Sequence, residues 1–315
     1  MLTLRETLPL AYSVCNLWHY PQYDESGVAM IRLFMDNDLP AIIEMVLQNR
    51  QMRPTEIEER VKSSTTWVFE DEVLHGCAAL GKVSESQHGQ EVWLWVYTAP
   101  NHRRQGIGEK LWQTVKGHLE DLSVVRLYTT YRTDDGANPQ LFTKHGFTPW
   151  YSAHTMRYTG PNFAEVDIKP VPYTNQMFED YVRLTNDGFR WLRSQCDIEP
   201  IDTYPAGCNE AKTRKQLIDD SSNIFLLYED GKAVGYTLLG SDFIDTIVID
   251  QAYQGRGLGR QLTQLSVNLL RQRGVDTVYL DVVDINVNAR RLYDSLGFER
   301  IETVEFARAT PADLR

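Results

Sequence analysis

The sequence predicts an α/β protein in which two similar domains follow one another, each with its α and β elements built around a mixed sheet. The first observation is the length, because 315 residues exceed the usual size of one hydrophobic core and suggest roughly two domains of about 150 residues. The second is a glycine-rich stretch, YQGRGLGRQL at Tyr253–Leu262, which recurs as HRRQGIGEKL at His102–Leu111. The third is that strand-like and helix-like segments alternate around both stretches.

The two glycine-rich stretches keep a constant offset. Gly106 and Gly257 are separated by 151 positions (257 − 106), and so are Arg103 and Gln254, which open the two motifs (254 − 103). The same offset carries the tripeptide HGF, which ends at Phe147, onto LGF (298 − 147). Self-similarity at so long a period indicates a duplicated domain, because solenoid units have roughly 20 to 50 residues.

The segments next to the glycines predict the same elements in both copies. EVWLWVYT and DFIDTIVI are β-branched and aromatic enough to be strands that enter the turns, and apolar residues at helical spacing follow each turn. VVRLYTT and TVYLDVV are then predicted as buried strands. Each is followed by a short helix that ends at Gly146 or Gly297, where glycine suits the left-handed stop.

Each half also opens in a similar way. AMIRLF and VDIKPV are predicted strands, followed by helices near residues 38–48 and 175–184 and by the strands TTWVFEDE and NIFLLYEDGKAVGYTLLG. The second half has a longer helical insertion at residues 187–220, and YTGPNF is the predicted linker. We therefore expect an amino-terminal extension at residues 1–27, an N-terminal domain at residues 28–160 and a C-terminal domain at residues 161–315.

Composition and charge exclude several classes of partner. The formal net charge of −11 argues against nucleic acid and anionic membranes, because these recruit basic surfaces. The four cysteines form no CxxC pair, and none lies beside a histidine at metal-ligand spacing, so we expect reduced thiols and no metal. No segment approaches the roughly 18 apolar residues of a membrane span. The expectation is a cytoplasmic monomer or homodimer without nucleic-acid or membrane partners.

The glycine-rich turns predict a phosphate ligand. A strand, a glycine-rich turn and a helix start leave backbone N–H groups unpaired at the positive end of the helix, and such groups bind phosphate oxygens. A dinucleotide fingerprint would need glycine in place of Leu111 and Leu262, or of Arg260 if counting begins at Gly255, and no GxxxxGK[ST] loop is present. A tight turn without a ligand is the alternative interpretation.

These residues resemble the GNAT acetyltransferase superfamily. The resemblance rests on the motif [QR]xxGxG after a strand and, about forty residues later, on the segment NVNARRLYDSLGF at residues 286–298. The resemblance covers roughly residues 28–160 and 161–315, and implies two tandem GNAT-like acyl-CoA N-acyltransferase domains in a layout remotely similar to that of mycothiol synthase. It implies acetyl-CoA as co-substrate, with its diphosphate on the turn amides and its pantetheine along the preceding strand. The implied contacts of the C-terminal domain are Ile247, Val248, Ile249, Gln254, Gly255, Arg256, Gly257, Leu258, Gly259, Arg260 and Asn286. Those of the N-terminal domain are Arg103, Arg104, Gln105, Gly106, Ile107 and Gly108.

Acetyl transfer to an amine needs a base for the amine and an acid for the leaving thiolate. Tyr293 matches the tyrosine that the family places near the sulfur, with packing beneath the cofactor as the alternative. Asn286 matches the family's asparagine near the cofactor, with a helix cap as the alternative. Asp242 and Asp245 are candidate bases. By alternation Asp245 shares a side with Ile247, but a bulge would change this parity, so both carboxylates stay open.

The first copy departs from the pattern at the acid. The offset places Phe142 opposite Tyr293 and Asp135 opposite Asn286, and phenylalanine has no proton to give. We therefore expect the C-terminal domain to be catalytic, acetylating a primary amine of a small molecule or a peptide by direct attack in a ternary complex. The alternative is a non-catalytic CoA-sensing or interaction module in which both copies are degenerate.

Overall fold

The structure is a computed structural model that describes residues 30–50, 52–86, 88–133 and 138–314. The predicted amino-terminal extension and Asp135 lie outside the described residues. The described residues form two compact units, one of residues 30–152 with 302–314 (the N-terminal unit) and one of residues 153–301 (the C-terminal unit).

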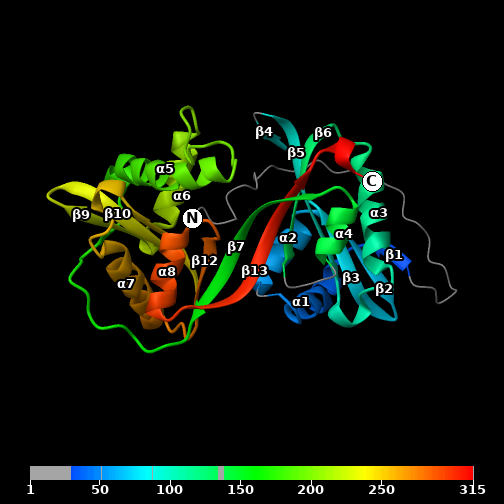
Figure 1. Cartoon of the computed structure of the whole chain (residues 1–315), viewed down its shortest axis with the longest axis horizontal. Helices are drawn as coiled ribbons and strands as arrows, with labels where there is room; N and C mark the ends of the chain where they lie inside the picture. Colours follow the sequence, from blue (N-terminus) through cyan, green and yellow to red (C-terminus); the bar gives the residue numbers. More distant parts are fainter. Residues whose placement is uncertain (1–29, 51, 87, 134–137, 315) are drawn as a thin grey trace. The chain divides into compact units, whose positions relative to one another are not determined.

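The N-terminal unit is a mixed sheet with helices on both faces (Figure 1). Its strands follow the order β1-β2-β3-β5-β6-β13, with β4 paired to β5, and β5 and β6 are parallel while the other pairs are antiparallel. The elements are β1 (Met30–Leu33), α1 (Leu39–Leu47), α2 (Pro54–Lys62), β2 (Thr65–Asp71), β3 (Val73–Leu80), β4 (Ser84–Ser86), β5 (Gly89–Thr98), α3 (Ile107–Leu119), β6 (Val124–Arg132), α4 (Asn138–Lys144), β7 (Thr148–Tyr158) and β13 (Glu299–Ala309).

Two hydrophobic clusters hold the helices to this sheet. On one face α3 packs Leu111, Trp112 and Val115, all fully buried, against alternate residues of the strands. On the other face α1 and α2 contribute Ile42 and Ile57 to a second cluster. The fully buried aliphatic and aromatic side chains account for the stability of this unit, because apolar burial is the main favourable term in folding.

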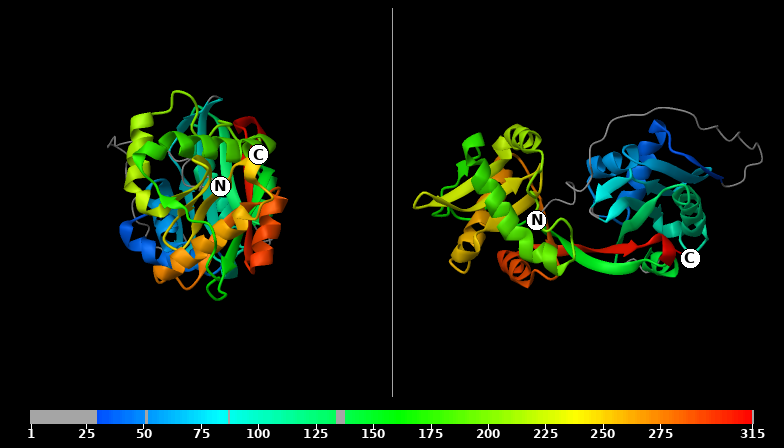
Figure 2. Two further views of the ribbon diagram at one scale, coloured as in Figure 1. Left: turned by 90° about the vertical axis from the view of Figure 1, so that its left-hand side faces the viewer. Right: turned by 90° about the horizontal axis from the view of Figure 1, so that it is seen from above.

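The C-terminal unit has a four-stranded antiparallel sheet, β11-β10-β9-β8, and a strand β12 that pairs with residues 153–158 of β7. Helix α5 covers one face of the four-stranded sheet and α7 the other (Figure 1), and the right-hand view of Figure 2 looks down on α5. The elements are β8 (Val171–Pro172), α5 (Phe178–Gln195), α6 (Glu210–Asp219), β9 (Ile224–Glu229), β10 (Lys232–Leu239), β11 (Ile244–Ile249), α7 (Leu258–Gln272), β12 (Val278–Val283) and α8 (Val287–Leu296).

Close packing fixes α5 against this sheet. Gly188 of α5 lies so near β11 that an added Cβ would come within 2.7 Å of the Val248 side chain. On the next strand the Tyr236 ring lies 4.7 Å from the Tyr181 ring, and its hydroxyl is 2.9 Å from Thr185 Oγ1. Helix α5 therefore has a defined position over β10 and β11.

Each unit takes its last strand from the other half of the sequence. Residues 153–158 of β7 pair with β12 in the C-terminal unit, and residues 304–309 of β13 pair with β6 in the N-terminal unit. The repeat in the sequence places a boundary near residue 160, and the compact units are offset from it because of these exchanged strands.

The predicted mixed α/β fold with two similar domains is confirmed, but one predicted strand is shortened. VDIKPV at residues 166–171 yields a strand at Val171–Pro172 alone. Pro170 and Pro172 supply no N–H group, so this edge cannot extend its ladder with β9. The predicted helix at residues 175–184 instead continues to Gln195, and a loop at residues 196–209 precedes α6.

Candidate functional site

In the C-terminal unit the parallel strands β11 and β12 diverge toward their carboxyl ends. Among the described residues they meet at one isolated bridge, Phe243–Tyr279, where the Tyr279 N–H donates to Asp242 O over 3.0 Å. Further along, β11 is paired with β10 and β12 with β7. The edge of β11 at residues 247–249 thus faces no strand on the β12 side within the described chain.

The N-terminal unit repeats this divergence. Strands β5 and β6 pair in parallel from Gln90 to Trp93, and the rest of β5 pairs with β3. Both units therefore have two parallel strands that separate several residues before the glycine-rich turn.

The glycine-rich turn of the C-terminal unit presents open backbone amides. Helix α7 begins at Leu258 after Gly257, whose φ of 80° is left-handed, and Gly255 has a φ of 76°. No side chain caps this helix, and the amides of residues 255–260 have no hydrogen-bond acceptor among the described residues. An ideal Cβ at Gly255 or Gly257 would meet no atom within 4 Å. The turn is therefore an uncovered amide surface at the positive end of a helix, which fits a phosphate group.

The backbone of the first turn matches that of the second. Arg104 (φ 61°) and Gly106 (φ 81°) are left-handed at the positions 151 residues before the two glycines. Ala99 (φ −51°, ψ 138°) likewise matches Asp250 (φ −50°, ψ 132°) at the entry to each turn. The offset read from the sequence is thus an offset in conformation as well.

The glutamine or arginine that opens each motif donates a hydrogen bond to the last residue of the preceding strand. The Gln254 side chain donates to Ile249 O over 3.1 Å, and Arg103 Nε donates to Thr98 O, also over 3.1 Å. These two contacts are related by the same offset of 151 residues. Glutamine and arginine serve equally here because both carry planar N–H donors.

The other predicted turn residues divide into packing and surface positions. Leu258 and Ile107 are buried in the two units and fix the starts of α7 and α3. A Cβ at Gly259 would lie 3.6 Å from Leu292 of α8, and one at Gly108 would lie 3.4 Å from Leu141 of α4. The glycines therefore let these neighbouring helices pack closely.

The arginines of the second turn already have partners. Arg256 is half-exposed and forms an ion pair with Glu229 at 2.9 Å, and its guanidinium also lies 5.1 Å from the Tyr253 ring. Arg260 Nη2 donates to Ser295 Oγ over 2.5 Å. In the first turn, Gln105 is exposed and donates to Asn101 O over 3.5 Å.

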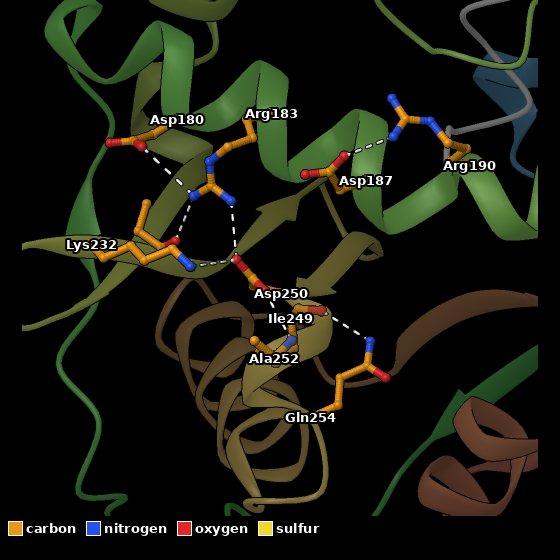
Figure 3. Close-up of polar contacts among 10 residues, drawn as sticks. Asp180, Arg183, Asp187, Arg190, Lys232, Ile249, Asp250, Ala252 and Gln254 are labelled. Atoms are coloured by element: carbon orange, nitrogen blue, oxygen red, sulfur yellow. Dashed lines mark hydrogen bonds and ion pairs between the residues drawn. The ribbon is translucent and has the colours of Figure 1, made fainter.

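Asp250, which the sequence reasoning did not single out, anchors the second turn (Figure 3). Its carboxylate accepts from Ala252 N over 3.0 Å and from Arg183 Nη1 of α5 over 3.0 Å, and it lies 3.3 Å from Lys232 Nζ of β10. Burial opposes the charge, but these contacts outweigh it and hold the pKa of Asp250 below its usual value. No signal in the sequence marks it, because the first copy has alanine at this position.

Tyr293 lies on α8 and is half-buried. Its ring lies 5.8 Å from the Phe298 ring, and burial raises the pKa of Tyr293 to about 12. Within the described chain its hydroxyl has no hydrogen-bond partner. Its counterpart Phe142 is fully buried in the core and stacks on Tyr131 at 5.5 Å. The two positions therefore share an offset but differ in both chemistry and environment.

One candidate base, Asp245, lies in a β-bulge of β11, and the other, Asp242, lies three residues before it. In the pairing of β10 with β11, Leu238 is opposite Thr246 and Leu239 is opposite Ile244, so Asp245 is the extra residue. The bulge breaks the alternation that would tie Asp245 to Ile247. Asp242 accepts a hydrogen bond from Ser241 Oγ over 3.0 Å.

The start of α8 is held by Asn286, in the capping role that was the alternative interpretation of this residue, and by a polar cluster around Asp284 that was not predicted. Asn286 accepts from Ala289 N over 3.2 Å and caps the helix. Asp284 bonds Arg290 of α8, and its Oδ1 lies 2.8 Å from Nε2 of His154, a buried residue of β7. No motif could have shown this, because His154 reaches the C-terminal unit through the exchanged strand.

The described part of the chain contains no group of three or more His, Cys, Asp or Glu side chains placed to hold a metal ion. None of its helices combines the length and the apolar character required to cross a membrane.

Two family profiles match the chain, one in each half. Residues 183–298 match the Acetyltransferase (GNAT) family, and residues 62–149 match the Acetyltransferase (GNAT) domain. Together they cover well over half of the sequence and include both glycine-rich turns. The chain belongs to the GNAT acetyltransferase family, with two domains in tandem. This family uses acetyl-CoA.

Curated relatives include mycothiol acetyltransferases and an enzyme that acetylates a ribosomal protein. The mycothiol acetyltransferase of Thermomonospora curvata is 41% identical over 86 residues, or 26% of this chain and 29% of that protein. The ribosomal protein bS18 alanine N-acetyltransferase of Haemophilus ducreyi is 36% identical over 22% of this chain and 48% of that protein. These alignments thus span less than half of either relative. The mycothiol acetyltransferase of Kytococcus sedentarius is 28% identical over 65% of this chain and 71% of that protein.

Solved structures share the fold. A GCN5-related N-acetyltransferase from Sphaerobacter thermophilus matches with a TM-score of 0.69 and 18% identity, over 90% of this chain and 96% of that one. A tandem GNAT protein from the clavulanic acid biosynthesis pathway matches with a TM-score of 0.62 and 13% identity, over 90% of this chain and 99% of that one. Both likenesses are in fold.

Proposed function

We propose that the C-terminal unit transfers an acetyl group from acetyl-CoA to a primary amine, by direct attack within a ternary complex. The observation that carries this proposal is the open amide surface of residues 255–260, which lies where β11 and β12 diverge. Tyr293, on the next helix, supports it with a hydroxyl that no described residue engages. Bound acetyl-CoA would supply the acetyl thioester.

Different residues of the chain are suited to bind different parts of acetyl-CoA. The amides of residues 255–260 are suited to the diphosphate, because they are unpaired donors at a helix N-terminus. The edge of β11 at residues 247–249, which faces no described strand on the β12 side, is suited to the amide groups of pantetheine, which pair with backbone as a neighbouring strand would. The Gln254 side chain fixes the end of this strand by donating a hydrogen bond to Ile249 O.

The proposed acid is Tyr293. With its pKa raised to about 12 by burial, the phenol stays protonated at neutral pH and can donate at the thiolate sulfur. The proposed base is Asp242 or Asp245. Because Asp245 lies in a bulge, strand alternation does not decide between the two carboxylates. The base would take a proton from the ammonium form of the acceptor, because the attacking amine must be neutral.

The acceptor is proposed as an amine of a small molecule or a peptide. Relatives are named for acetylation of mycothiol and of an alanine of ribosomal protein bS18, so the similar enzymes include both classes. A panel of polyamines, amino sugars and peptides with amino-terminal alanine, followed by release of free thiol, would identify the class.

The test of the acid is Tyr293→Phe. General acid catalysis contributes about 10²–10⁴-fold, so we expect turnover to fall by that order where thiolate departure limits the rate, with acetyl-CoA affinity unchanged. Tyr228→Phe is the matched control, because Tyr228 is also a tyrosine of this unit with a pKa raised to about 12 by burial and lies on β9. Loss of acetyl-CoA affinity in Tyr293→Phe would assign Tyr293 to packing instead.

A second candidate function is a CoA-sensing module. The fully buried Phe142 favours it for the N-terminal unit, which has the turn but no acid. Saturable acetyl-CoA binding without thiol release across the whole amine panel would support this function for the entire chain and refute the enzyme.

A further inference from the structure

Asp250 connects the glycine-rich turn to helix α5. One carboxylate oxygen accepts from Ala252 N inside the turn, and the other accepts from Arg183 Nη1 on α5 (Figure 3). Arg183 also donates to Ala233 O on β10 over 2.7 Å. A single arginine thus joins helix, sheet and turn, and Lys232 adds a second cation beside the same carboxylate.

The turn does not need this carboxylate for its shape. In the N-terminal unit Ala99 occupies the matching position with nearly the same φ and ψ as Asp250, and the turn that follows has the same left-handed residues. Asp250 must therefore serve something beyond the local backbone. Its two cationic partners come from outside the turn, and the N-terminal unit has no counterpart because Ala99 cannot accept a hydrogen bond through its side chain.

The same helix holds the insertion that precedes α6. Asn186 of α5 donates to Tyr204 O over 3.0 Å and accepts from Tyr204 N over 2.9 Å, as a neighbouring strand would. One turn further on, Arg190 bonds Asp202 through Nε and Nη2 at 3.0 and 2.9 Å. Helix α5 is therefore attached to the turn through Arg183 and, within the next two helical turns, to the loop of residues 196–209 through Asn186 and Arg190.

We propose that Asp250 is a positioning residue that couples acetyl-CoA binding at the turn to the order of the insertion at residues 196–209. The path runs from the turn through Asp250 and Arg183 into α5, and from Asn186 and Arg190 into the loop. The inference rests on the proposed function, because acetyl-CoA must occupy the C-terminal turn.

Hydrogen–deuterium exchange of the full chain, with and without acetyl-CoA, tests this coupling. Two variants break the connection in different ways. Asp250→Asn keeps an oxygen for Ala252 N but removes the charge that holds Arg183, and Arg183→Met keeps the aliphatic stem but removes the guanidinium. The control is Arg157→Ala, which removes an exposed ion pair with Glu299 in the same unit. Melting curves and the exchange pattern without ligand establish that each variant is folded.

We expect acetyl-CoA to slow exchange in the wild type both at residues 254–260 and at residues 196–209. In both variants the turn should still be protected, with affinity lower by about fivefold or more, while the protection of the insertion is lost. The control should behave as the wild type does.

Two results would overturn the coupling alone. One is protection of the turn without protection of the insertion in the wild type, and the other is full protection of the insertion in both variants. Absence of protection at residues 254–260 in the wild type would overturn the proposed function, and the coupling with it.

Discussion

Replacing Gly257 by valine separates the role of the turn in binding from its role in folding. Gly257 is the residue before α7, with a left-handed φ of 80° and open space where a Cβ would stand. A Cβ there would meet no atom within 4 Å, so a valine side chain would occupy open space at the turn without touching the rest of the protein. Binding of a phosphate at the amides of residues 258–260 should therefore be lost although the unit still folds.

The two magnitudes can be worked from the structure. Because no atom lies within 4 Å of the added Cβ, the cost to folding is the left-handed conformation alone, about 1–2 kcal/mol. For a unit of this size that lowers the melting temperature by about 2–8 °C. Hydrogen bonds to a charged group contribute about 1.5–3 kcal/mol each, so losing two of them weakens acetyl-CoA binding by roughly 10²–10⁴-fold.

Gly274 provides the matched control at the other end of the same helix. Its φ is 85°, and a Cβ there also meets no atom within 4 Å, so Gly274→Val carries the same strain far from the turn. Titration calorimetry with acetyl-CoA should show wild-type affinity for Gly274→Val and no measurable heat for Gly257→Val, with similar melting temperatures. Equal affinities of the two variants would refute the assignment of the turn.

Two further predictions concern the N-terminal unit. Arg50 and Glu302 form a buried ion pair at 2.6 Å, so Glu302→Ala should lower the free energy of unfolding, measured in urea, by about 3–5 kcal/mol. The double change Arg50→Met with Glu302→Leu should recover most of this loss, because it leaves no unpaired buried charge. Equal losses of stability in the single and the double variant would contradict this prediction. The Lys144 ammonium holds the pKa of Glu109 at about 2 against the effect of burial, with help from His145. Because this pKa lies below the unfolded value of about 4.3, the stabilisation is complete above that value and disappears as pH falls toward 2. Melting temperatures between pH 6 and 2 should therefore fall less steeply for Glu109→Gln, and an unchanged slope would rule out this contribution.

Local elements and their repetition could be predicted from the sequence. The β-branched segments before the turns, the glycines themselves and the helical spacing after them are all short-range signals, and each appears as expected in β5, β11, α3 and α7. Gly297 ends α8 in a left-handed conformation, as the pattern indicated. The offset of 151 residues then predicted which positions would share a backbone, and the matched φ and ψ of Ala99 and Asp250 follow from it.

Long-range pairing could not be predicted in this way. The alternation within β7 shows which of its residues share a face, but it does not say which strand is its neighbour, so its pairing with β12 was missed. The same limit hid His154, which acts on α8 from the other half of the sequence. Asp250 was not predicted for a different reason. A carboxylate at a turn is common, and the role of Asp250 depends on its contact with Arg183, a residue 67 positions away.

A crystal structure of the full chain with acetyl-CoA tests the central claim most directly. We predict that the diphosphate of the bound co-substrate contacts the amides of residues 255–260, and that its sulfur lies within hydrogen-bond distance of the Tyr293 hydroxyl. A diphosphate bound elsewhere on the C-terminal unit, or a sulfur out of reach of Tyr293, would contradict it.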